Sequence, residues 1–166
     1  MKKSIFIALL AVMLSLSSNA QSNLKKVYDE TIDPMEQIDK AVAKAKATDK
    51  NVICQLGGNW CRWCLMFADY VTKDSEISKF IDDNFVYIHV NYNPRERADQ
   101  AKSQKNAQLL KRLNNPGRFG YPVFVILNPE GKVIHIQDSS FLEQDNSYNK
   151  EKVMRFLRNW TPSAVK

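Results

Sequence analysis

Residues 57–67 read GGNWCRWCLMF, and the two cysteines in this stretch, Cys61 and Cys64, are separated by two residues. The preceding run, NVICQL at 51–56, is short, apolar and followed by two glycines, which is typical of a buried strand. After Cys61 the apolar residues recur at helical spacing as far as about residue 73. The pattern therefore places Cys61 in the first turn of a helix, directly after a buried strand and a Gly-Gly turn.

This placement favours an ionised sulfur at Cys61. The free N–H groups and the dipole at a helix N-terminus stabilise a thiolate, and Arg62 adds a positive charge beside it. A free thiol has a pKa of about 8.5, and sites of this kind lower it to roughly 3.5–7.5. Cys64, three residues later, returns to the same side of the helix. A reactive outer thiolate followed by a second thiol is what thiol–disulfide exchange requires.

Two other interpretations of the cysteine pair are a metal site and a structural staple. Structural zinc takes four ligands, and the remaining soft or borderline donors, Cys54, His89 and His135, do not form a second pair. A disulfide that closes only a four-residue loop would constrain little of the unfolded chain. We therefore predict no metal, and no cofactor other than the redox-active Cys61–Cys64 disulfide itself.

The same three donors have ordinary structural interpretations. Cys54 falls within the predicted strand, where a free cysteine behaves as a small hydrophobe; a regulatory third thiol is the alternative. His89 lies in the run FVYIHV and is expected to be a packed or hydrogen-bonded strand residue, with a catalytic proton role as the alternative. We expect His135 to be structural as well.

The rest of the chain alternates between helical and strand patterns. Asp33 and Pro34 are a cap and a first-turn residue for a helix at 34–49. Strands joined through helices are expected to be parallel, and the last strand returns as an antiparallel hairpin partner. The fold class is therefore α/β, with a mixed central sheet of about four to five strands flanked by helices. Beyond 34–56, the predicted elements are a helix at about 61–73, a second helix at 76–84 capped by Asp74 or Ser75, and a strand at 85–90. They continue with a helical pattern within 96–113 that includes Ala98, strands at 123–128 and 132–137, and a helix at 149–160.

The first 20 residues have the three parts of a secretory signal peptide, which are a positive start, an apolar run at 5–16 and small residues at 18–20. The apolar run is shorter than the roughly 20 residues that span a membrane, so cleavage between Ala20 and Gln21 is preferred over an uncleaved anchor. We expect a signal peptide at 1–20, a lead-in segment at 21–33, one domain at 34–166, and a periplasmic or otherwise exported location.

The charge and the cysteine count exclude two further classes. The net charge of +6 falls to +4 when Lys2 and Lys3 are removed with the signal peptide, and no basic stripe with interleaved aromatic residues is present, so nucleic acid is a poor partner. Three cysteines in an exported chain of this size do not form a disulfide scaffold. We expect a monomer.

The chain resembles the thioredoxin-fold family from about Val27 to Trp160, and two stretches carry the resemblance: Gly58–Cys64 and Gly120–Leu127. The resemblance implies a cis peptide bond before Pro122, beside the cysteine pair, where the backbone of Tyr121 would pair with an extended substrate peptide. An ordinary trans proline that begins a strand is the alternative. Trp60 would lie partly exposed beside the thiolate, and simple packing is the alternative for this residue.

This chain departs from the family in three places. Typical thioredoxins carry Gly-Pro between the cysteines, whereas this chain has Arg62-Trp63. They also bury an acid six residues before the first cysteine, where this chain has Gln55, so deprotonation of Cys64 must use water or another group. The segment between the second strand and Pro122 is longer than usual and is a candidate for covering the site or docking a partner.

These observations lead to one functional hypothesis and two rivals. We expect an exported thiol–disulfide oxidoreductase, with a reductase or isomerase favoured, that exchanges disulfides with protein cysteines and draws on a thiol electron donor in the membrane or periplasm. Cys61 and Cys64 are the predicted catalytic pair. The rivals are a peptide-binding module with non-catalytic cysteines and a copper or zinc carrier. The predicted substrate-binding residues are Trp60, Arg62, Trp63, Tyr121 and Pro122.

Overall fold

The computed structural model describes residues 24–96 and 99–166. The predicted signal peptide at 1–20, the start of the lead-in segment and Ala98 lie outside the described residues. Within the described ranges, no helix has both the length and the apolar character needed to cross a bilayer.

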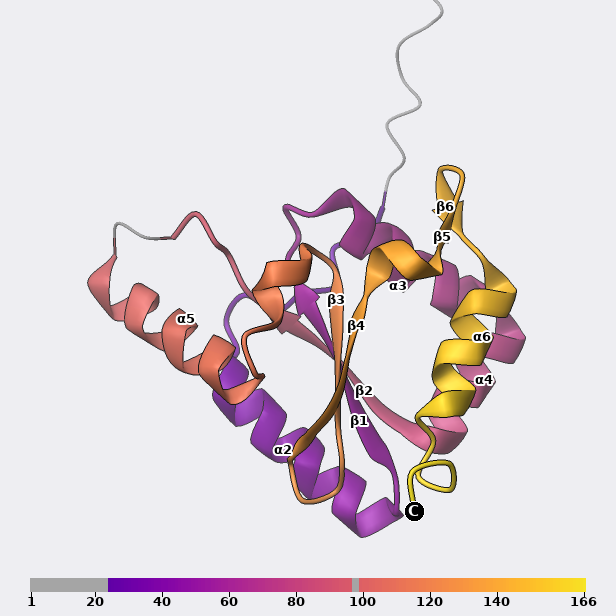
Figure 1. Cartoon of the computed structure of the whole chain (residues 1–166). Coiled ribbons are helices and arrows are strands. Elements are labelled where there is room, and N and C mark those ends of the chain that lie inside the picture. The colour runs from indigo at the N-terminus through magenta and orange to yellow at the C-terminus, as the bar shows by residue number, and fades with distance from the viewer. Residues whose placement is uncertain (1–23, 97–98) are drawn as a thin grey trace, which may run out of the picture.

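Helices and strands alternate nearly as the sequence predicts. The predicted helices and the four predicted sheet strands are present, and the elements that were not predicted are two 3₁₀ turns and a short hairpin (Figure 1). In chain order the structure contains α2 (Pro34–Thr48), β1 (Asn51–Gly57), α3 (Arg62–Lys73), α4 (Ser75–Asn84), β2 (Phe85–Asn91), α5 (Gln100–Arg112), η1 (Pro116–Phe119), β3 (Val123–Leu127), β4 (Val133–Asp138), η2 (Ser139–Leu142), β5 (Glu143–Gln144), β6 (Ser147–Tyr148) and α6 (Lys150–Asn159).

Capping side chains set where the helices begin. The Asp33 carboxylate accepts hydrogen bonds from the backbone N–H groups of Met35 and Glu36, and Pro34 occupies the first position of α2, as predicted. Asp74 caps α4 in the same way. Such caps satisfy N–H groups that have no partner within the helix, which explains why the helix starts were readable from the sequence.

The sheet is mixed, with the order β2-β1-β3-β4. β1 and β2 are parallel, whereas β3 is antiparallel to β1. The expectation that β3 would run parallel, because a helix separates it from β2, is wrong. After α5 the chain turns back through η1 and re-enters the sheet at the end where β2 finished (Figure 1), so the connection passes over β1 and returns to the end of the sheet from which it left.

The direction of β3 decides what lies beside the cysteine helix. Leu56, near the end of β1, pairs with Val123 at the start of β3 and with Val90 near the end of β2. The residues that precede β3 therefore lie at the same end of the sheet as the residues that follow β1. A parallel β3 would place Pro122 at the opposite end, away from Cys61.

Helices cover both faces of the sheet (Figure 1). Side chains on a strand alternate between the two faces, so Val52, Cys54 and Leu56 of β1 pack in the core beneath α2 and α5. Ile53 packs in the opposite core, beneath α3, α4 and α6. Phe67 of α3 lies in this second core and connects the cysteine helix to β3 and to the β5–β6 hairpin.

We expect Phe67→Ala to lower the free energy of unfolding by about 3–5 kcal/mol, the usual cost of emptying a buried phenylalanine site. Phe67 is fully buried, with its ring centroid 4.4 Å from that of Phe124 and 4.8 Å from that of Tyr148. Urea unfolding of the oxidised protein measures the change. Phe141 is 71% exposed, so Phe141→Ala is the matched control, with an expected change within about 0.5 kcal/mol. Equal losses in the two variants would contradict this packing.

Candidate functional site

A disulfide between Cys61 and Cys64 lies at the start of α3, and its two sulfurs differ in exposure. Cys61 is the N-cap of α3, and its sulfur accepts a hydrogen bond from the backbone N–H of Cys64 at 3.2 Å. Cys61 is 7% exposed, whereas Cys64 is fully buried. An incoming sulfur can therefore approach Cys61, and Cys64 is shielded behind it. This arrangement agrees with the predicted placement of the outer cysteine at a helix N-terminus.

Glycine at position 57 lets the end of β1 lie directly against the inner sulfur. A Cβ atom at this position would be 2.4 Å from the Cys64 sulfur and 3.0 Å from the hydroxyl oxygen of Tyr28. Real Cβ contacts are not this short, so no side chain fits here without displacing the sulfur. The Gly-Gly turn of the sequence thus has a packing role in addition to turning the chain.

The Gln55 side chain forms the polar wall of the site behind Cys64. It is fully buried, and its Nε2 donates to the backbone oxygen of Cys64 at 2.8 Å and to the Tyr28 hydroxyl oxygen at 2.6 Å. Its Oε1 accepts a hydrogen bond from the Tyr87 hydroxyl. The amide is therefore fully hydrogen-bonded, as buried polar groups usually are. Gln55, which stands where typical thioredoxins bury an acid, thus has a structural role here.

Asn59 hydrogen-bonds the lead-in segment to the turn that precedes the cysteines. Its Oδ1 accepts hydrogen bonds from the backbone N–H groups of Val27 and Tyr28, both at 3.2 Å, and its Nδ2 donates to the backbone oxygen of Tyr28 at 2.8 Å. Tyr28 is only 4% exposed and packs with both cysteines and Leu65. Although the sequence suggested a polar lead-in at 21–33, Tyr28 from that segment is part of the site.

Three aromatic rings form a patch on the outer side of the disulfide. Trp60 is 38% exposed, its Nε1 donates to the backbone oxygen of Tyr92 at 3.0 Å, and its ring meets that of Tyr121 edge-on at 5.4 Å. Tyr92 stacks on Tyr121 at 5.5 Å. Tyr121 packs against the cysteine cluster, and the bond between Tyr121 and the buried Pro122 is cis, in agreement with the resemblance.

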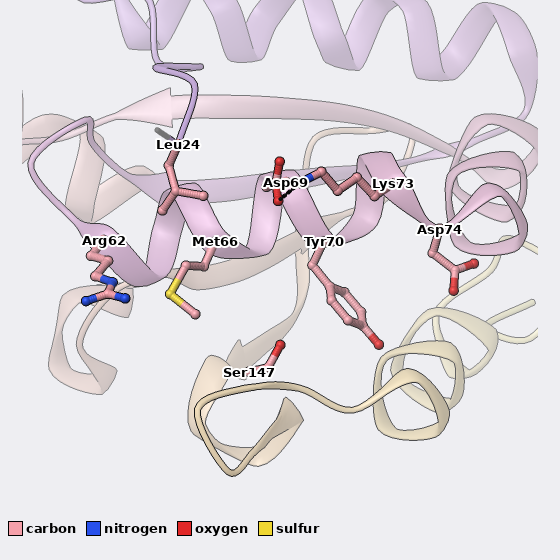
Figure 2. Close-up of a pocket in the computed structure, with 8 residues that line it drawn as sticks. All are labelled: Leu24, Arg62, Met66, Asp69, Tyr70, Lys73, Asp74 and Ser147. Atoms are coloured by element: carbon pink, nitrogen blue, oxygen red, sulfur yellow. Dashed lines mark ion pairs between the residues drawn. The ribbon is translucent and has the colours of Figure 1, made fainter. Parts of the chain in front are cut away.

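The two residues between the cysteines diverge. Trp63 is half-buried, and its ring meets that of Tyr148 edge-on at 5.6 Å, so it anchors α3 to the β5–β6 hairpin. Arg62 is exposed and lines a groove of about 450 Å³ together with Leu24 and Met66 (Figure 2). The structure thus gathers Trp60, Trp63 and Tyr121 around the disulfide, while the Arg62 side chain extends along the neighbouring groove.

Comparison with known families places this fold among thioredoxin-like proteins. Residues 13–162 match the family model described as "Thioredox_DsbH: Protein of unknown function, DUF255". The chain belongs to this family. The family's thioredoxin-like character agrees with the mixed sheet and with the position of the cysteine pair at the start of α3.

Solved structures share the fold at low sequence identity. A disulphide isomerase from Xylella fastidiosa Temecula1 aligns with a TM-score of 0.67 and 24% identity, over 82% of this chain and 97% of that chain. A DsbH oxidoreductase aligns with a TM-score of 0.50 and 18% identity, over 85% of this chain and 89% of that chain. A thioredoxin from Thermus thermophilus aligns with a TM-score of 0.50 and 21% identity, over 73% of this chain and 81% of that chain. Comparison with curated proteins gave no significant match.

The three residues considered as extra metal donors do not converge. Cys54 is fully buried on the opposite face of β1 from Gln55, and burial raises the pKa of its thiol to about 12. His135 stacks on Trp160 at 4.1 Å in the C-terminal part of the fold. Within residues 24–96 and 99–166, no three His, Cys, Asp or Glu side chains are grouped as a metal site.

His89 lies behind the Gln55 wall. Its ring meets those of Tyr28 and Tyr87 edge-on at 5.4 Å and 5.2 Å, and its Nε2 is buried with no hydrogen-bond partner among the described residues. Burial lowers the pKa of His89 from 6.5 to about 4. The imidazole is therefore neutral at physiological pH and packs between two aromatic rings.

Sequence reasoning missed two residues of the site, Tyr28 and Asn59. Their contacts join positions 31 and 32 residues apart, which no local periodicity reveals. The signal that could have found Asn59 is its place in the turn just before the cysteines, where an amide side chain is suited to bind nearby backbone groups. Tyr28 stands among polar residues and carries no comparable signal.

We expect His89 to make the protein less stable as the pH falls from about 6.5 to about 4. Its folded-state pKa of about 4 lies below its unfolded value near 6.5, so the unfolded chain binds a proton first and acid favours unfolding. Unfolding midpoints at pH 7 and pH 5 should separate more in the wild type than in His89→Leu, which cannot titrate. Carboxylates contribute equally to both proteins, and equal pH dependences would contradict the burial of this imidazole.

Proposed function

We propose that this chain is a thiol–disulfide oxidoreductase that exchanges disulfides with cysteines of other proteins through Cys61 and Cys64. The observation that carries the proposal is the unequal exposure of two bonded sulfurs at a helix N-terminus, with Cys61 reachable and Cys64 buried behind it. Membership of a thioredoxin-like family supports it. Solved relatives with the same fold include one titled a disulphide isomerase and one titled an oxidoreductase.

The exchange follows from the geometry. In the reduced protein the Cys61 thiolate attacks one sulfur of a substrate disulfide, forming a mixed disulfide and releasing the other substrate sulfur as a thiolate. The Cys64 sulfur then attacks Cys61, the Cys61–Cys64 bond forms, and the second substrate thiol leaves. The substrate gains two electrons and the cysteine pair loses two, while the proton that Cys64 gives up and one from solvent end on the substrate sulfurs.

The N-cap position favours the first step. The backbone N–H of Cys64 points at the Cys61 sulfur, and further unpaired N–H groups and the helix dipole at this end stabilise negative charge there. The exposed ring of Trp60 and the Tyr121-Pro122 segment lie where a substrate polypeptide would approach. A thiol donor, such as a reduced dithiol protein, would return the pair to its reduced state in a reductase or isomerase cycle.

We expect Cys61→Ser to abolish the acceleration of insulin reduction over the rate with dithiothreitol alone, because Cys64 and Cys54 are fully buried. Without dithiothreitol, Cys64→Ala should accumulate a mixed disulfide on Cys61, visible as a band that disappears on reduction. Cys54→Ala is the matched control, since Cys54 is buried on the far face of β1, and it should retain activity. If Cys61→Ser reduced insulin as fast as Cys54→Ala does, the proposal would fail, and a role in binding peptides or metal would replace it.

The proposed location is outside the cytoplasm, in the periplasm of a bacterium, and it rests on the signal-peptide pattern of residues 1–20. We expect protein expressed from the full coding sequence to begin at Gln21, as read by intact-mass measurement of the purified chain. Replacing Ala20 by a bulky residue such as phenylalanine should block processing because the peptidase requires a small side chain there. A chain that kept Met1 in the wild type would contradict export by this route.

A further inference from the structure

The Cys64 thiol must lose its proton in a place where no carboxylate or amine is buried among the described residues, and the neutral imidazole of His89 contacts the rings of Tyr28 and Tyr87. The buried polar or charged side chains among the described residues, apart from tyrosines and cysteines, are Asn51, Gln55, Ser139 and Thr161. None of them is a carboxylate or an amine. Gln55, which stands directly behind Cys64, has an amide that neither gives nor takes a proton at physiological pH. The negative charge on the inner sulfur therefore needs a neutral hydrogen-bond donor.

The Tyr28 hydroxyl is placed to be that donor. It lies 3.0 Å from the position that a Cβ on Gly57 would occupy, and the Cys64 sulfur lies 2.4 Å from the same position. The hydroxyl and the sulfur therefore both border the space that the missing side chain of Gly57 leaves. Tyr28 also packs in the same buried cluster as both cysteines.

The hydrogen-bond directions leave the hydroxyl hydrogen of Tyr28 available. The backbone oxygen of Cys64 only accepts, so the Gln55 atom that contacts it must be the amide nitrogen. The same nitrogen contacts the Tyr28 oxygen, which therefore acts as an acceptor there and can donate its own hydrogen elsewhere. Burial raises the pKa of Tyr28 far above the physiological range, so the hydroxyl keeps this hydrogen and acts as a donor, not as a base.

The other titratable groups around Cys64 have contacts with residues other than its sulfur. From β2, the Tyr87 hydroxyl donates to Gln55 Oε1 and His89 presents its ring to Tyr28. From the β5–β6 hairpin, the Tyr148 hydroxyl donates to the backbone oxygen of Trp63 at 3.1 Å. Tyr121 packs on the outer, aromatic side of the cluster with Trp60 and Tyr92. Unlike these groups, Tyr28 places its hydroxyl at the same Gly57 space as the inner sulfur.

We propose that the Tyr28 hydroxyl donates a hydrogen bond to the Cys64 sulfur once the disulfide is open, and so stabilises the thiolate that resolves the mixed disulfide. This proposal rests on the proposed function. In the resolving step the Cys64 thiolate attacks Cys61, the Cys61–Cys64 bond forms, and the bond from Cys61 to the substrate sulfur breaks. The substrate sulfur takes the electron pair and, through solvent, the proton that Cys64 has given up.

Asn59 has a positioning role in the same arrangement. Its side chain accepts a hydrogen bond from the backbone N–H of Tyr28 and donates one to the backbone oxygen of Tyr28, which holds the backbone of this residue beside the turn that precedes the cysteines. The lead-in segment therefore contributes a functional group to the site, and Asn59 holds that group in register with the cysteine helix.

The first experiment measures the ionisation of Cys64 without requiring exchange activity. In a Cys61→Ser background, the ultraviolet absorbance of the thiolate is followed against pH. Adding Tyr28→Phe should raise the pKa of Cys64 enough to lower the thiolate fraction roughly 10-fold at a given pH, the usual effect of losing a hydrogen bond to a charged group. Tyr148→Phe is the matched control, because it removes another buried hydroxyl beside α3 that does not adjoin the sulfur. Equal pKa values of Cys64 in the Tyr28→Phe and Tyr148→Phe variants would overturn the proposal.

The second experiment follows the resolving step in the full chain. Tyr28→Phe should slow release of a mixed disulfide with glutathione roughly 10-fold at neutral pH and move its pH profile to higher pH, while the alkylation rate of Cys61 stays unchanged. If the Tyr28→Phe variant does not fold, 3-fluorotyrosine at position 28 provides a stronger donor of nearly the same shape, and it should lower the pKa of Cys64. No change in that pKa would also overturn the proposal. If exchange itself were absent, the thiolate titration would still decide the role of Tyr28.

Discussion

The side-chain amide of Gln55 joins three separate parts of the chain behind the inner sulfur. Through it, the lead-in residue Tyr28, the first turn of α3 at Cys64 and the strand residue Tyr87 share one buried hydrogen-bonded group. A buried amide that loses any of these partners leaves a polar atom unsatisfied, at a cost of about 1–3 kcal/mol. The positions of β1, β2, α3 and the lead-in are therefore mutually dependent, and the disulfide lies where they meet.

The direction of β3 provides the other half of the site. Helix starts and strand cores could be predicted because Asp33 and Asp74 are local caps and the apolar runs have clear periods. The direction of β3 could not be predicted, because it depends on the path of the chain through η1 after α5. That path is set by tertiary packing, and it brings Tyr121 to the outer side of the disulfide.

The cysteine pair itself was predictable, whereas its surroundings were only partly so. The Cys-x-x-Cys spacing, the preceding strand and the glycine pair are all local, and the structure places them as the sequence indicates. Tyr28 and Asn59 depend on a contact across about 30 residues, and the β5–β6 hairpin that receives Trp63 is too short to have a recognisable period. A two-residue strand leaves no period in a single sequence, and the turn position of Asn59 does not show which distant backbone its amide will bind.

The titratable side chains around Cys64 are neutral, and this affects the chemistry of the cysteine pair. Burial raises the pKa values of Tyr28, Tyr87 and Tyr148 and lowers that of His89 to about 4. These groups therefore keep one protonation state through the physiological range, unlike a buried carboxylate, which would titrate together with the thiol. Among the described residues packed around the inner cysteine, the two sulfurs are then the groups whose charge changes during exchange. The neighbouring side chains supply fixed dipoles, so the reactivity of Cys64 depends on which hydrogen-bond donors contact its sulfur.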